Sequence, residues 1–241
     1  AGAPWLQEEV RRTQEVASRL GFASVPDLKK EVARQIRDYV EGGGFLFAMC
    51  SATETLELAL AAENVDIAAA FSDGSPADPR ASEKMDWSNS MAFEGGQVQV
   101  APSVNSFSDI DGHQVNTPWR EELSVFSLFD FSAKFDPVPA MLTQNHQAAL
   151  PDFYGLTTSF SKERLKSGTI VLAEDGGRAK YVHGSFGEGT WTFYGGHDPE
   201  DPEHQIGDPP TDLALHPNSP GYRLILNNVL FPAAKKKELK T

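Results

Sequence analysis

The feature that most constrains the fold is the apolar run at residues 45–50 (FLFAMC), which lies between three glycines and a helical pattern. It shows no alternation of apolar and polar residues, so it predicts a strand covered on both faces, as in a parallel sheet. Ser51 and Glu54 then fit a capping box, in which each side chain satisfies a free backbone amide of the other residue. The chain therefore passes from a buried strand directly into a helix, with Cys50 at the corner.

Helical spacing predicts two helices before this strand, over residues 4–20 and from about Pro26 onward. Residues 65–71 predict a further strand. This succession indicates an α/β layer fold with a parallel sheet and helices on both faces. An open parallel sheet usually begins with a strand, so we also expect that one or more leading β-α units are missing from this chain.

The remainder predicts a β-rich insertion, a hairpin, a loop and a final helix within one domain. The insertion contains a turn-rich stretch and short β-type runs such as SVFSLFDF. The hairpin turns through Gly187 to Gly189, and the loop is rich in acids and prolines. The insertion covers residues 72–150, the hairpin 180–194, the loop 197–212 and the final helix 222–230. All four belong to one domain that spans 1–241.

Composition excludes several classes of function. The net charge of −13 argues against nucleic acid or an anionic membrane surface as partner, and the basic tail at 235–241 is expected to be solvated. No apolar run approaches the roughly 20 residues that cross a bilayer, so we expect no membrane insertion. A single cysteine excludes an internal disulfide and a CxxC zinc site. We expect no metal and no cofactor, because the acidic loop lacks the spacing of a calcium site and is better explained as a rigid surface segment.

Cys50 has two interpretations. A nucleophile elbow needs a strand, a sharp turn and a helix, with small residues such as Ala48 and Ala52 near the nucleophile. The positive end of the following helix would favour a thiolate, and the backbone amide of Ser51 could hold an oxyanion. Alternatively, Cys50 is a small buried residue, since cysteine is among the most buried types. The local pattern leaves both interpretations open.

A thiolate nucleophile needs a base, and His197 is the best placed of the six histidines. It follows a predicted strand and precedes a run of acids, so a base and an orienting carboxylate could lie together. His183, in the middle of the hairpin, is expected to be a half-buried structural residue.

Together, GGGFLFAMCSATETLELAL and GTWTFYGGHDPED resemble a class I glutamine amidotransferase-like domain. The resemblance implies a flavodoxin-like fold with Cys50 as nucleophile, His197 as base and Glu200 as orienting acid. The second block is also similar to trehalose-utilisation-like domains, many of which lack the cysteine. Nearly the whole chain resembles a bacterial group, chiefly from Bacteroidetes, labelled asparagine synthetase B, which implies an exported protein.

The chain departs from these families at several positions. The elbow has alanine where amidotransferases usually have glycine, and Asp198 stands between the histidine and the proline, which moves the acid one residue further on. A glutamine-dependent asparagine synthetase needs an N-terminal cysteine and an SGGxDS loop for ATP. Neither occurs in this chain, so we reject that activity.

The sequence therefore predicts an amide hydrolase or transferase that uses Cys50, His197 and Glu200 on a small-molecule substrate. The alternative is a carbohydrate-handling domain without a catalytic cysteine, in which Trp191 and Tyr194 stack on a sugar. A third hypothesis is a structural or interaction module of a larger exported protein.

Overall fold

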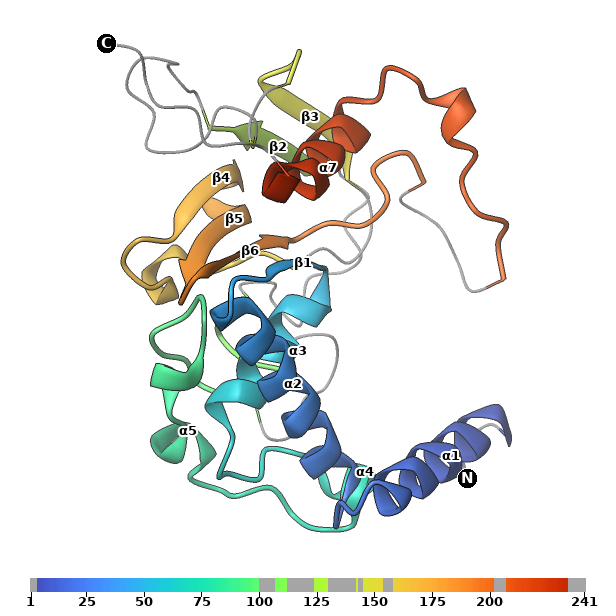
Figure 1. Ribbon diagram of the computed structural model, residues 1–241, viewed down its shortest axis with the longest axis vertical. Helices are drawn as coiled ribbons and strands as arrows, with labels where there is room; N and C mark the ends of the chain where they lie inside the picture. The colour runs from blue at the N-terminus through green and yellow to red at the C-terminus, as the bar shows by residue number, and fades with distance from the viewer. Residues whose placement is uncertain are drawn as a thin grey trace.

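The computed structural model describes residues 4–99, 107–111, 124–129, 142, 145–153, 158–201 and 207–233. Its centre is a six-stranded mixed sheet in an α/β arrangement (Figure 1). The strands are β1 (Phe45–Met49), β2 (Ser124–Leu128), β3 (Ala149–Phe153), β4 (Ile170–Asp175), β5 (Arg178–Phe186) and β6 (Gly189–Tyr194). The α-helices are α1 (Pro4–Arg19), α2 (Val25–Glu41), α3 (Ser51–Ala61), α4 (Ala70–Asp73), α5 (Ala81–Lys84) and α7 (Pro220–Leu230). The 3-10 turns are η1 (Trp87–Asn89), η2 (Lys162–Arg164), η3 (Leu213–Leu215) and η4 (Phe231–Ala233).

The sheet differs from the parallel sheet that the sequence predicts. In the order β1-β6-β5-β4-β2-β3, only β1 and β6 pair in parallel, and the other pairs are antiparallel. The reason lies in the turns: Gly176 and Gly177, both with positive φ, join β4 to β5, and Gly187 with φ 58° begins the turn from β5 to β6. Turns this short connect only antiparallel neighbours, whereas a parallel pair needs a long crossover.

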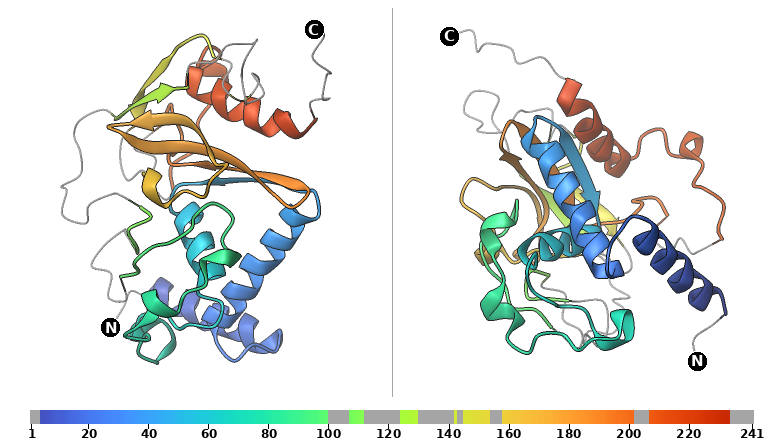
Figure 2. Two further views of the ribbon diagram at one scale, coloured as in Figure 1. Left: turned by 90° about the vertical axis from the view of Figure 1, so that its left-hand side faces the viewer. Right: turned by 60° about the horizontal axis from the view of Figure 1, so that its bottom comes forward.

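Helices cover both faces of the sheet (Figure 2). Residues of α2 and α3 pack on one face against Trp191 and Phe193 of β6. On the other face, Leu224 of α7 packs with Tyr181 and Tyr194. The α3 helix therefore begins at the end of β1 with one side against the sheet, and α7 lies across the opposite face.

The helices and the hairpin that the sequence predicts are confirmed at α1, α2, β5–β6 and α7. In α2, Pro26 lies in the first turn and the Ser24 hydroxyl accepts from the Asp27 amide. Of the β-type runs expected in 72–150, SVFSLFDF supplies β2, and the start of β3 also falls in this region. Both strands belong to the main sheet. Much of the rest of the region, like the basic tail 235–241, lies outside the described residues.

Two local predictions are wrong. Residues 65–71 form no strand: the Asp66 carboxylate accepts from the Ala68 amide, and α4 begins at Ala70. The capping box is also absent, because α3 has Cys50 as its N-cap with no side-chain cap, and Glu54 points into the protein instead. No helix among the described residues has the length and apolar character needed to cross a membrane.

Candidate active site

Cys50 occupies a strained corner between β1 and α3. Its backbone has φ 52° and ψ −143°, and it is the one non-glycine residue in the described part of the chain with a positive φ. Such a conformation costs about 1–3 kcal/mol and persists only where the surroundings enforce it. The Cys50 amide donates to the Tyr194 carbonyl at 2.8 Å. The Cys50 carbonyl accepts from the Thr53 amide at 3.2 Å and from the Thr53 hydroxyl at 2.7 Å. Strain held at this corner is typical of a displayed nucleophile.

The Cys50 thiol contacts His197, with 2.7 Å between Sγ and Nε2. Burial raises the pKa of the thiol, but the hydrogen bond and the charge of His197, together with hydrogen bonds from Ser51, outweigh it. The pKa of Cys50 is therefore below its ordinary value, which increases the thiolate fraction near neutral pH. The cysteine is half-buried rather than sealed within the core.

His197 reaches the thiol because β6 runs parallel to β1. The register pairs Met49 with Tyr194, so both strands end at the same edge of the sheet. Two glycines, Gly195 and Gly196, then carry the chain from β6 to the histidine. A Cβ at Gly195 would lie 2.1 Å from the Thr158 carbonyl oxygen, so this path requires glycine.

Asp198 anchors the loop that carries His197. Its carboxylate accepts from the Tyr222 hydroxyl at 2.6 Å, from the Thr211 hydroxyl at 2.8 Å and from the Glu200 amide at 3.0 Å. Burial raises the pKa of Asp198, but these hydrogen bonds to the charged form outweigh it and leave the pKa below its ordinary value. These donors fix the loop, and with it the position of the neighbouring imidazole.

The structure brings Cys50, His197 and Ser51 together, and it places Glu200 in another contact. The Glu200 carboxylate pairs with Nδ1 of His216 at 3.1 Å. Ser51, proposed from the sequence as an oxyanion donor, lies at the first turn of α3 and hydrogen-bonds to the thiol through its amide and hydroxyl.

The aromatic residues proposed as a sugar platform lie in the core. Trp191 is 1% exposed and Tyr194 is 0% exposed, so neither offers an open ring face for stacking. His183 is buried at 5% exposure, where the sequence predicts a half-buried residue: its Nδ1 lies 2.9 Å from the Thr192 hydroxyl, and burial lowers its pKa to about 4.

Sequence reasoning missed two buried acids in α3. Glu54 accepts from the Ser108 hydroxyl at 2.6 Å, and Glu57 accepts from the Ser90 hydroxyl. Burial raises the pKa of each carboxyl to about 7. The signal was available, because Glu54 lies four residues before the apolar Leu58 and Glu57 four residues before the apolar Ala61, so each acid would be buried with an apolar residue on the same helix face.

Within the described residues, no cluster of three or more histidine, cysteine, aspartate or glutamate side chains could hold a metal ion. The corner between β1 and α3 therefore holds the Cys50 thiol in contact with the His197 imidazole, beside the N-terminus of α3.

Comparison with known proteins adds little to this picture. No protein-family model matches the chain, and no curated protein matches it. Among solved structures it is similar to "Cytoplasmic Protein STM1381 from Salmonella typhimurium LT2", with 16% identity and a TM-score of 0.40. The alignment covers 85% of this chain and 61% of that one, so the chain spans less than two thirds of that protein's length.

Proposed function

We propose that the protein is a cysteine-dependent amide hydrolase or transferase with Cys50 as nucleophile and His197 as base. The observation that carries the proposal is the 2.7 Å contact between Sγ and Nε2 at a strained strand-to-helix corner. A buried structural cysteine requires neither a positive φ nor an imidazole partner. Both features are expected of a nucleophile that must be displayed and deprotonated.

In the proposed reaction, His197 takes the thiol proton and the Cys50 sulfur attacks the amide carbon. The oxygen gains the electron pair of the carbonyl bond and is stabilised by the N-terminus of α3, where we place the Ser51 amide as a donor. His197 then gives its proton to the leaving nitrogen, the carbon–nitrogen bond breaks and a thioester forms. Water, or another acceptor, attacks the thioester with His197 again as base and releases the thiol.

We also propose a relation to the class I glutamine amidotransferases, with their flavodoxin-like fold. It is supported by the order strand, cysteine, helix in β1–Cys50–α3 and by a histidine that follows the neighbouring parallel strand. Glu200, which the resemblance makes the orienting acid, pairs with His216, so the proposal here rests on Cys50 and His197 alone.

The test is the pH dependence of Cys50 alkylation by iodoacetamide. The wild type should be labelled rapidly below pH 8, and His197→Ala should be labelled more slowly, by about tenfold for each unit by which the thiol pKa rises. His146→Ala, which removes an exposed histidine, is the matched control and should label like the wild type. Ammonia release from L-glutamine and other primary amides, lost in Cys50→Ala, would then identify substrates. Labelling that is slow in the wild type or unchanged in His197→Ala would refute the proposal.

A further inference from the structure

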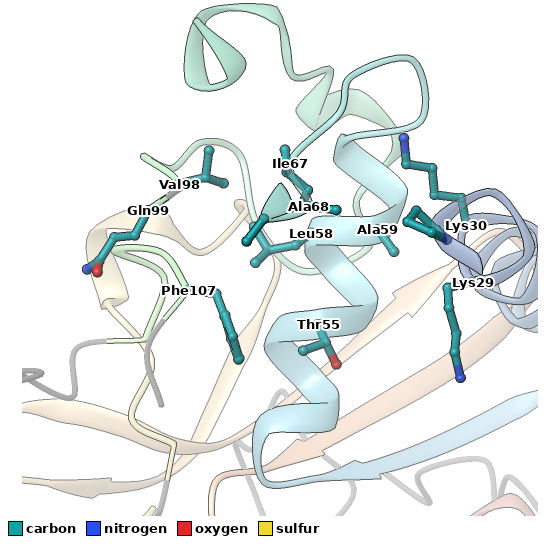
Figure 3. Close-up of a pocket in the computed structure, with 12 residues that line it drawn as sticks. Lys29, Lys30, Thr55, Leu58, Ala59, Ile67, Ala68, Val98, Gln99 and Phe107 are labelled. Carbon is teal, nitrogen blue, oxygen red and sulfur yellow. The ribbon is translucent and has the colours of Figure 1, made fainter. Parts of the chain in front are cut away.

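A groove runs along α3 next to the cysteine corner (Figure 3). Its floor is α3, through Thr55, Leu58 and Ala59. The start of α2 forms one wall, and Val98 and Phe107 stand on the other side of the helix. The groove encloses about 260 Å³. At roughly 30 Å³ for a group the size of a water molecule, it has room for about eight carbon atoms.

One face of α3 extends from the Cys50 thiol to the groove. Ser51, Thr55 and Ala59 are spaced four residues apart, so they lie on one side of the helix. Ser51 and Thr55 are exposed and Ala59 is half-buried. Ser51 hydrogen-bonds to the Cys50 thiol, whereas Thr55 and Ala59 line the groove. With a rise of about 1.5 Å per residue, the groove begins roughly 8 Å from Cys50 along the helix.

The lining favours an apolar, uncharged occupant. Most of the side chains are aliphatic or aromatic, and the lysines Lys29 and Lys30 contribute the basic groups. The Lys30 ammonium already donates to the Val65 carbonyl at 2.7 Å, and the acids Asp27 and Asp66 lie near it. An anionic ligand would meet these acids, whereas an alkyl chain would only cover apolar surface.

The proposed reaction determines which part of the substrate lies here. His197 protonates the leaving nitrogen, so the leaving group lies on the side of the β6 loop that carries the histidine. The acyl part stays attached to Cys50, and we place it along α3, away from His197. This step rests on the function proposed above.

We propose that the groove along α3 is an acyl-chain subsite, and that the substrates are amides whose acyl group is a linear aliphatic chain. A chain must extend about 8 Å before it reaches Thr55, so acetyl and butyryl groups are too short to enter, an octanoyl group reaches only the entrance, and a decanoyl group places its terminal carbons inside. Each methylene buried there strengthens binding severalfold.

The first experiment compares kcat/KM for the p-nitroanilides of acetic, butyric, octanoic and decanoic acids. The wild type should show a step of at least about tenfold between butyryl and decanoyl. Ala59→Trp and Thr55→Trp fill the groove at two positions and should remove this step. Gln35→Trp adds the same side chain at an exposed position of α2 outside the groove and should keep the step.

The second experiment does not depend on catalysis. Decanamide should bind saturably to Cys50→Ala protein in calorimetry, bind at least about tenfold more weakly when Ala59→Trp is added, and bind normally when Gln35→Trp is added. Decanamide binding without hydrolysis of any anilide supports the subsite and contradicts the proposed function. Anilide hydrolysis with no chain-length step, or no saturable binding of decanamide, overturns the subsite and leaves the catalytic proposal standing.

Discussion

The first turn of α3 and the two turns that follow it carry ionisable side chains whose pKa values move in opposite directions. At the first turn, His197 and Ser51 lower the pKa of Cys50 although burial opposes them. One and two turns later, burial raises the pKa of Glu54 and Glu57 to about 7 although hydrogen bonds oppose it. The helix thus shifts a weak acid towards its charged form and two stronger acids towards their neutral form.

This difference shows that the charge of a buried side chain depends on its hydrogen-bond partners more than on its residue type. The thiol is half-buried and has an imidazole at 2.7 Å, so an ion can form there. Glu54 and Glu57 are fully buried, and their hydrogen-bond partners are neutral hydroxyls and amides. One oxygen of each carboxyl has no hydrogen-bond partner among the described residues, which suits a protonated group better than an anion. One short helix therefore begins at a thiol with a lowered pKa and carries two carboxyls with raised pKa values in its interior.

The largest expected effect is a loss of stability as pH rises. The folded-state pKa of each carboxyl, about 7, lies above the ordinary value of 4.5. The folded state therefore holds the proton more tightly, and the stabilisation is complete below pH 4.5 and is lost as pH rises to about 7. Between pH 5 and pH 7, each carboxyl should lower the free energy of unfolding by about 2 kcal/mol, or about 4 kcal/mol together.

Urea unfolding at pH 5, 6 and 7 measures this loss. Glu54→Gln with Glu57→Gln should remove this loss, because neither amide titrates. The double variant should then become more stable as pH rises, because the folded-state pKa of His183, about 4, lies below its ordinary value of 6.5. The lowered pKa of Cys50 acts in the opposite sense: its contribution is present above the unfolded pKa and is lost as pH falls through the folded one. A profile that stays equally steep in the double variant would show that other groups cause the pH dependence.

The next effect concerns Glu57 alone. Its carboxylate accepts from the amides of Met91 at 3.0 Å and Ala92 at 3.1 Å as well as from Ser90. Glu57→Ala would leave these buried donors without an acceptor and should cost about 3 kcal/mol. Glu57→Gln keeps a carbonyl oxygen and should cost clearly less. Urea midpoints measure both values, and equal losses would mean that side-chain volume rather than hydrogen bonding is responsible.

Much of the cysteine corner could be predicted from sequence, because it depends on local order. The apolar run before Cys50, the helical pattern after it and the histidine after the YGG segment each give a pattern that a single sequence shows. The 2.7 Å contact joins residues 147 positions apart and requires that β6 pair in parallel with β1, which no local pattern encodes.

The predictions that were wrong failed for identifiable physical reasons. Glu54 fits a capping box as well as a buried site, and the choice depends on Ser108, which lies 54 residues away. The aromatic residues of β6 alternate as in a strand with one solvent-exposed face, but α3 and α7 cover both faces of the sheet. The glycine turns indicated antiparallel strands, but the wholly apolar β1 favoured a parallel sheet, and the prediction followed β1.

A smaller effect concerns the loop that holds His197. Tyr222→Phe removes the 2.6 Å hydrogen bond to Asp198, and should lower stability by about 1 kcal/mol. Because Asp198 adjoins His197, iodoacetamide labelling of Cys50 should also slow a few-fold. Tyr39→Phe, at a tyrosine that is 60% exposed, is the control and should change neither value. Slower labelling in the control as well would show that the effect is not specific to the loop.

The smallest effect separates two roles for Glu200. Its carboxylate pairs with His216 at 3.1 Å, and both side chains are partly exposed, so the pair should stabilise the loop by less than about 1 kcal/mol. If Glu200 acts only through this pair, Glu200→Gln and His216→Ala should slow Cys50 labelling to the same small extent, and the double variant should add nothing further. If Glu200 instead orients His197 directly, Glu200→Gln should slow labelling far more than His216→Ala. The labelling rates of the four proteins distinguish a Cys50–His197 dyad supported by a loop from a triad that includes Glu200, and the contact between Glu200 and His216 favours the dyad.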